Sequence, residues 1–170
     1  MTALKPNRML PLIVIAITCL PTMVFADNLS IQGSYLLESR DLPDGSVLKP
    51  PIIVGMISYT KRYRNVNVSW VNPDGKRLSI SYIAKYRLTP TTYQETPVYW
   101  MSNNFNGHAV SYKVPAFKGG KNAVTIKDGT ISFPLAGVSP VVEFSSDGMT
   151  ATARNNQGKL IYVDHWKKVE

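Results

Sequence analysis

The chain has 170 residues, a length typical of one domain, and Cys19 is its only cysteine. Lysine and arginine number 19 against 11 aspartate and glutamate residues, which gives a formal net charge of +8. A single cysteine excludes an intramolecular disulfide and a cysteine-based metal site. The basic balance is compatible with solubility or with an anionic partner.

The first 26 residues have the three parts of a secretory signal peptide. Lys5 and Arg8 give a positively charged start, residues 9–20 are apolar, and Val24 and Ala26 provide small side chains where a signal peptidase cleaves. The apolar run is shorter than the roughly 20 residues that cross a bilayer. We therefore predict export to the periplasm or out of the cell.

Cleavage after Ala26 leaves a mature domain of residues 27–170. It has 144 residues, no cysteine, and 17 lysine and arginine residues against 11 acidic ones, for a formal charge of +6. An uncleaved anchor and a lipoprotein are the alternatives. Lipid attachment at Cys19 is disfavoured because Thr18 stands where glycine, alanine or serine normally precedes the modified cysteine.

Apolar and polar residues alternate along most of the mature domain, and this period of two predicts strands. The expected strands are residues 31–39, 52–59, 66–70, 78–88, 92–101, 109–114, 123–126, 131–135, 141–144, 149–153 and 160–166. Residues 102–107 and 115–121 are expected to be loops. Pro97 indicates a bend within one strand, and Gly55 indicates a bulge or a close backbone approach in another.

The clearest hairpin joins residues 66–70 to residues 78–88 through the turn Asn72-Pro73-Asp74-Gly75. Both strands have one apolar and one polar face, so the sheet should cover a single interior. The sequence predicts an all-β fold, an antiparallel up-and-down β-barrel of about eight to ten strands, because closure removes exposed sheet edges. A β-sandwich is the alternative.

Four short motifs are spread over the mature domain: Gly33-Ser34-Tyr35-Leu36-Leu37, Asp44-Gly45, Val54-Gly55-Met56-Ile57-Ser58-Tyr59-Thr60 and the closing Asp164-His165-Trp166. Together they resemble the bacterial lipocalin-like domain proteins. The resemblance implies a calycin-type barrel with an internal cavity. Tyr35 stands where animal lipocalins have a tryptophan, so the resemblance supports the fold more than a transport function.

Aromatic residues gather on the predicted interior face of the barrel. Trp70, Tyr82 and Tyr86 share the apolar face of the clearest hairpin, and Trp100 lies on the strand that should pair next to it. A barrel of about eight strands is either filled by side chains or holds one small ligand. These four residues are therefore candidate ligand-binding residues, with a plain packed core as the alternative.

Cations gather before the clearest hairpin, where Lys61, Arg62 and Arg64 should form a basic rim. Such a rim is either solvated or placed to meet an anionic lipid surface. Lys76 and Arg77 should lie at the other end of the barrel, since successive turns of a meander alternate between ends. An exported protein with its cations divided in this way is not expected to bind nucleic acid.

Residues able to support catalysis are few. His108 falls in an expected loop and His165 on the outer face of the last strand, so no metal or other cofactor is predicted. Glu95, Glu143 and Asp164 fall in expected strands, where alternation turns Glu143 outward and Asp164 inward. An inward carboxylate either accepts hydrogen bonds as a structural group or has a raised pKa and acts as an acid, base or ligand anchor.

Three functions are compatible with these features. The favoured one is an exported barrel that binds a small apolar or amphipathic ligand. The second is a solid barrel whose basic surface docks on anionic lipid or a protein partner. The third is a calycin-type cyclase or isomerase that uses Asp164, and the sequence assigns it no further catalytic residue.

Overall fold

The computed structural model describes residues 30–103, 110–113, 119–135 and 140–170, which form strands and turns. The described strands are β1 (Gly33–Asp41), β2 (Val47–Leu48), β3 (Ile53–Tyr59), β4 (Tyr63–Val71), β5 (Arg77–Thr89), β6 (Thr92–Asn103), β7 (Val110–Lys113), β8 (Gly120–Ala123), β9 (Thr125–Lys127), β10 (Thr130–Pro134), β11 (Val141–Phe144), β12 (Gly148–Arg154) and β13 (Leu160–Lys168). The expected signal peptide and His108 lie outside the described residues. Within the described ranges no helix is long and apolar enough to cross a membrane.

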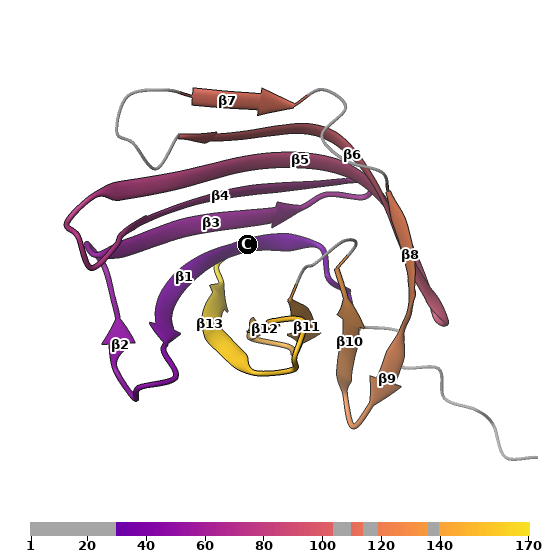
Figure 1. Ribbon diagram of the computed structural model, residues 1–170. Helices are drawn as coiled ribbons and strands as arrows, with labels where there is room; N and C mark the ends of the chain where they lie inside the picture. The colour runs from indigo at the N-terminus through magenta and orange to yellow at the C-terminus, as the bar shows by residue number, and fades with distance from the viewer. Residues whose placement is uncertain (1–29, 104–109, 114–118, 136–139) are drawn as a thin grey trace, which may run out of the picture.

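The strands form one antiparallel sheet that curls into a nearly closed barrel (Figure 1). Two meanders, β3 to β6 and β9 to β13, are joined by β1, which pairs with β3 along one edge and with β13 along the other. The other two edges of the sheet are linked by β8 and β9, which follow each other along the chain. β8 pairs with β6, and β9 pairs with β10. In Figure 1, β3 to β6 cross the upper half of the view and β11 to β13 lie beneath them. The predicted all-β up-and-down barrel is confirmed.

The predicted hairpin and the predicted irregularity at Pro97 are both present. β4 and β5 pair without interruption beyond the turn that begins at Asn72. The register between β5 and β6 shifts next to Ala84, which lies opposite Pro97. Because proline has no amide hydrogen to donate, the ladder is interrupted at the position where that donor is missing.

β6 is longer than expected, and the loop predicted from Ser102 onward is wrong for its first two residues, which belong to β6. The side chain of Asn103 bonds to the backbone of β5. Its Oδ1 accepts from the N–H of Ser79 at 2.7 Å, and its Nδ2 donates to the carbonyl of Arg77 at 2.7 Å. These bonds extend the pairing of the two strands.

β8 occupies part of the predicted connection over residues 115–121. Gly119 allows the chain to approach β6, since a Cβ at this position would lie 2.3 Å from the carbonyl oxygen of Glu95. That separation is shorter than a van der Waals contact, so only glycine fits. β8 and the two-residue β2 are too short to show alternation, and the barrel has more strands than the eight to ten predicted.

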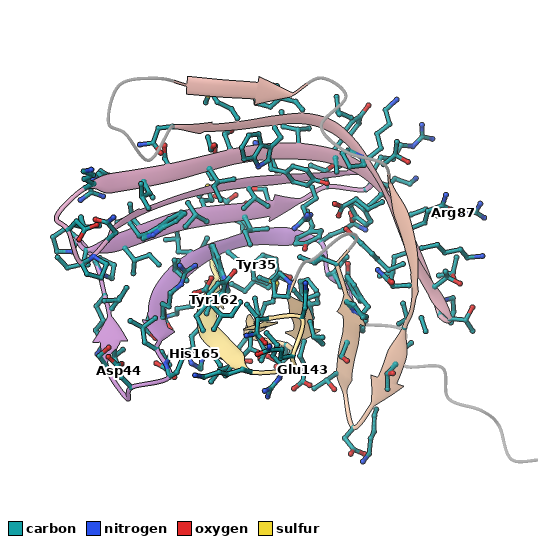
Figure 2. All side chains as sticks on the ribbon, viewed as in Figure 1. Tyr35, Asp44, Arg87, Glu143, Tyr162 and His165 are labelled. Carbon is teal, nitrogen blue, oxygen red and sulfur yellow. The ribbon has the colours of Figure 1, made fainter. Side chains whose placement is uncertain are left out.

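One part of the interior is filled by stacked and edge-to-face aromatic rings, which we call the aromatic cluster. Its ring centroids are separated by 4.2 to 6.2 Å, a spacing at which aromatic rings attract one another. Its members are Tyr35, Tyr59, Tyr86, Tyr93, Phe133 and Phe144. Figure 2 shows Tyr35 between the two halves of the sheet. This part of the barrel is packed.

Trp166 crosses the interior from β13 and packs against β3, as its predicted inward orientation requires. Its side chain is buried, and its ring tip lies 3.0 Å from the point where a Cβ on Gly55 would be. The register of β3 with β4 is unbroken. Gly55 is therefore a site of close approach, which was one of its two predicted roles, and it is not a bulge.

The buried phenols make the fold sensitive to alkaline pH. Burial raises the pKa of Tyr35 and of Tyr86, each to about 12, above the value of about 10 for a free tyrosine. Because the folded-state pKa is raised, the stabilisation from these groups is complete below about pH 10 and is lost as the pH rises toward about 12. We expect β-sheet circular dichroism to disappear and tyrosinate absorbance to grow together over this interval. Ionisation of all tyrosines near about pH 10 with unchanged circular dichroism would contradict this expectation.

Candidate functional site

A cavity of about 670 Å³ occupies the barrel interior beside the aromatic cluster. Side chains of β1, β3, β4, β5, β6, β12 and β13 contribute to its wall, together with Leu135, Pro140 and Val142. Most of these side chains are apolar or aromatic. Binding pockets for small molecules generally enclose about 300 to 1,000 Å³ behind such a wall, so this cavity is the candidate functional site.

Three of the four predicted ligand-binding residues lie in the cavity wall, and these are Trp70, Tyr82 and Trp100. Tyr82 and Trp100 are cross-strand partners on β5 and β6. Tyr86 is different, because its ring packs against Tyr59 and Tyr93 within the aromatic cluster. Of the two predicted roles, three of these aromatic residues therefore line the cavity, and Tyr86 belongs to the packed core.

Two of the three cations predicted to form the basic rim are exposed, and the third is buried. Lys61 and Arg62 are exposed in the turn between β3 and β4. Arg64 is only 6% exposed and lines the cavity, so its placement on the rim was wrong. β4 begins at Tyr63 and alternates from there, which turns Arg64 inward on the same face as Trp70.

Arg64 is held by a buried network around Glu95, which is 1% exposed. The Nη2 of Arg64 donates to Oε1 of Glu95 at 3.0 Å, and the hydroxyls of Tyr82 and Tyr93 also donate to this carboxylate. The guanidinium lies 4.8 Å from the ring centroid of Tyr82. Burial, reinforced by Glu95, raises the pKa of both tyrosines, so they remain donors. A buried charge is stable only with such partners.

A second buried ion pair lines the cavity. Arg40 Nε donates to Oδ1 of Asp164 at 2.6 Å, and Arg40 Nη2 donates to Oδ2 at 2.9 Å. The guanidinium lies 3.9 Å from the ring centroid of Tyr162 and 5.6 Å from that of Trp70. Both oxygens of Asp164 therefore already accept a hydrogen bond, as expected for a structural carboxylate.

The predicted inward orientation of Asp164 is confirmed, because it is 4% exposed. Burial raises the pKa of its carboxyl group, and the hydrogen bonds and charge of Arg40 oppose that shift. Arg40 itself was not predicted. The register of β1 with β13 shifts between Leu37 and Ser39, and this bulge reverses the alternation, so that Arg40 points inward where simple parity turns it out.

Among the residues that the structure describes, three fully buried side-chain atoms lack a hydrogen bond of good geometry, and they belong to residues of the cavity wall. They are the hydroxyl of Tyr59, Nε of Arg64 and Nε1 of Trp166. Tyr59 and Arg64 face each other across the β3–β4 ladder. Burial raises the pKa of Tyr59, and the adjacent guanidinium of Arg64 opposes that shift, so the hydroxyl remains protonated beside Arg64.

The remaining sequence candidates lie on the outer face of the sheet. Figure 2 shows Glu143 and His165 on the side of their strands that faces away from the interior, as alternation predicts. His165 Nε2 lies 2.8 Å from Oδ2 of Asp41. No group of three or more histidine, cysteine or acidic residues is placed to hold a metal in the ranges that the structure describes.

No known protein family, curated protein or solved structure shows a significant match to this chain. The lipocalin-like resemblance therefore remains a prediction. Function has to be argued from the cavity and its polar groups.

Replacing Glu95 with glutamine should strongly destabilise the fold, because Arg64 would keep its charge in the interior without a counter-charge. Removing one partner of a buried ion pair costs about 3 to 5 kcal/mol. The same substitution at Glu143, which is exposed, should change stability by less than about 0.5 kcal/mol. Denaturant unfolding of both variants measures the difference. Equal stability of the two variants would contradict the proposed importance of the network.

Proposed function

We propose that this chain is an exported, lipocalin-like protein that binds a small amphipathic molecule inside the barrel. The observation that carries the proposal is the cavity of about 670 Å³. Its wall is largely apolar and includes all three tryptophans of the chain, with a few polar groups at fixed positions. This combination is characteristic of small-molecule sites.

The size of the side chains in the wall also supports a binding role. Protein interiors are normally packed to the density of organic crystals, and a cavity reduces stability by about 24 cal/mol per Å³. Small or medium side chains nevertheless stand at inward positions where larger ones would reduce the space. Ala151 on β12 and Val66 and Val68 on β4 are examples. A barrel that served only as a rigid scaffold would be more stable with these positions filled.

The alternative functions have less support from the same residues. Docking on anionic lipid depends on a basic rim, and with Arg64 buried against Glu95 that rim consists of Lys61 and Arg62. A cyclase or isomerase that uses Asp164 would have to free a carboxylate that Arg40 already binds through both oxygens. The binding proposal requires neither a larger basic rim nor a free Asp164 carboxylate.

Filling the cavity should abolish binding. In the Ala151→Phe variant the new ring enters the cavity, and we expect the affinity for the neutral apolar dye N-phenyl-1-naphthylamine to fall at least tenfold. Dye fluorescence and energy transfer from the three tryptophans measure binding directly. Thr152→Phe is the matched control, because Thr152 is the next residue on β12 and faces the other side of the sheet.

Two outcomes decide the proposal. Strong dye binding by the unaltered protein and by Thr152→Phe, with loss in Ala151→Phe, would support it. Dye binding that is equal in all three proteins would place the dye elsewhere and contradict the proposal. Truncation of Trp70 or Trp100 to alanine should also weaken binding, and unchanged affinity in both would remove them from the site.

A further inference from the structure

The outer surface of the barrel carries a group of cations that binding inside the cavity does not use. The group comes from the β3–β4 turn, from the second half of β5 and from β8. All of its members are exposed. We call this group the basic face, and it consists of Lys61, Arg62, Lys85, Arg87 and Lys121.

The pairing of the strands brings these separate segments together. The carbonyl of Arg62 accepts from the N–H of Tyr86 at 2.8 Å, so the β3–β4 turn runs beside β5 next to Arg87. On β6, Gln94 pairs with Arg87 on one side and with Lys121 on the other. Because neighbouring strands are about 4.8 Å apart, the long cationic side chains of the three segments project close to one another.

The strands around the basic face contain no exposed acidic residue. In β4, β5, β6 and β8 the one carboxylate is that of Glu95, which is buried and paired with Arg64. Within the described part of the chain, no cation of the basic face takes part in an ion pair. Figure 2 shows Arg87 apart from the exposed acids Asp44 and Glu143. The positive charge of this face is therefore not compensated by protein groups beside it.

Two exposed apolar side chains accompany the cations. Tyr63 is 41% exposed and pairs with Lys85, whose Nζ lies 5.9 Å from the centroid of the tyrosine ring. Val98 is 38% exposed and lies two residues from Thr96, the partner of Lys85 on β6. Tyrosine is enriched where proteins meet the membrane–water interface. Clustered lysine and arginine residues attract anionic headgroups.

We propose that the basic face docks the protein on an anionic lipid bilayer. The predicted rim supplies Lys61 and Arg62, and β5 and β8 add three further cations from elsewhere in the chain. Each lysine or arginine near an anionic bilayer changes the affinity about fivefold, so five together give substantial attraction where two give little. This docking is separate from binding inside the cavity and adds a second activity to it.

The shape of the basic face favours a bilayer over a single anionic chain. The sheet curls around its interior, so its outer surface is convex (Figure 1). A bilayer presents many phosphates at once, and long lysine and arginine side chains can reach them from a curved support. On their inner side, β5 and β6 carry Tyr86 and Tyr93 of the aromatic cluster. The basic face is thus backed by the packed part of the barrel, and docking leaves the cavity wall undisturbed.

Sedimentation with vesicles tests the proposal on the purified protein. We expect binding to vesicles of equal parts phosphatidylglycerol and phosphatidylcholine, and at least tenfold weaker binding to vesicles of phosphatidylcholine alone. Raising the salt concentration from about 0.05 M to about 0.5 M should release the protein, because salt screens exposed charges. Failure to bind the anionic vesicles at low salt, or binding that is equal for both compositions, would overturn the proposal.

A pair of double variants separates the basic face from net charge. Lys85→Gln with Arg87→Gln removes two cations from the face, and we expect at least tenfold weaker binding to the anionic vesicles. Lys76→Gln with Lys159→Gln is the matched control, because it removes the same charge from exposed positions in the β4–β5 and β12–β13 turns. The control should bind within about threefold of the unaltered protein. Equal weakening in both variants would assign the binding to net charge and refute the basic face.

Two further measurements separate the alternatives. Heparin is the soluble polyanion, and if it binds the protein more tightly than the vesicles do and loses affinity in the Lys85→Gln, Arg87→Gln variant, the partner is not a bilayer. N-phenyl-1-naphthylamine, titrated without vesicles, should bind this variant as it binds the unaltered protein, since both side chains lie on the outer face. Absence of dye binding by the unaltered protein refutes only the proposed function, whereas absence of vesicle binding refutes only the docking.

Discussion

The buried contact between Arg64 and Glu95 is the interaction on which both parts of the barrel interior depend. Through the hydroxyl of Tyr93 the carboxylate of Glu95 is bonded to the aromatic cluster. Through Arg64 and Tyr82 the same carboxylate is bonded to the wall of the cavity. Because each buried charge requires its partners, these side chains hold one arrangement. The network therefore fixes where the packed part of the barrel ends and the cavity begins.

The second ion pair gives the cavity its other fixed polar group. Arg40 and Asp164 come from the first and last long strands, which pair with each other to join the two meanders. Their contact thus both links the two meanders and lines the cavity. The interior is therefore an apolar space whose two buried ion pairs are each neutral overall.

Alternation along the chain was sufficient to predict the longer strands, the barrel and three of the aromatic residues in the cavity wall, but not the short strands β2 and β8. The same alternation would have turned Arg64 inward on the face of Trp70, but Arg64 was assigned to the turn before the strand. The inward position of Arg40 could not be predicted, because it depends on a bulge in β1 that changes the parity. The separation of Tyr86 from the cavity depends on rings brought from other strands, which a local pattern does not contain.

The wall of the barrel is not equally strong around its circumference. Where β8 and β9 close the sheet, the ladder between β8 and β6 has only four residue pairs, and the ladder between β9 and β10 has only three. The β4–β5 ladder, by comparison, has nine. Local opening of a protein follows its weakest cooperative unit, so this seam separates at a lower free-energy cost than the rest of the wall. The aromatic cluster and the long ladders can stay intact meanwhile, so the backbone amides of this seam should exchange with solvent faster than those of the β4–β5 ladder.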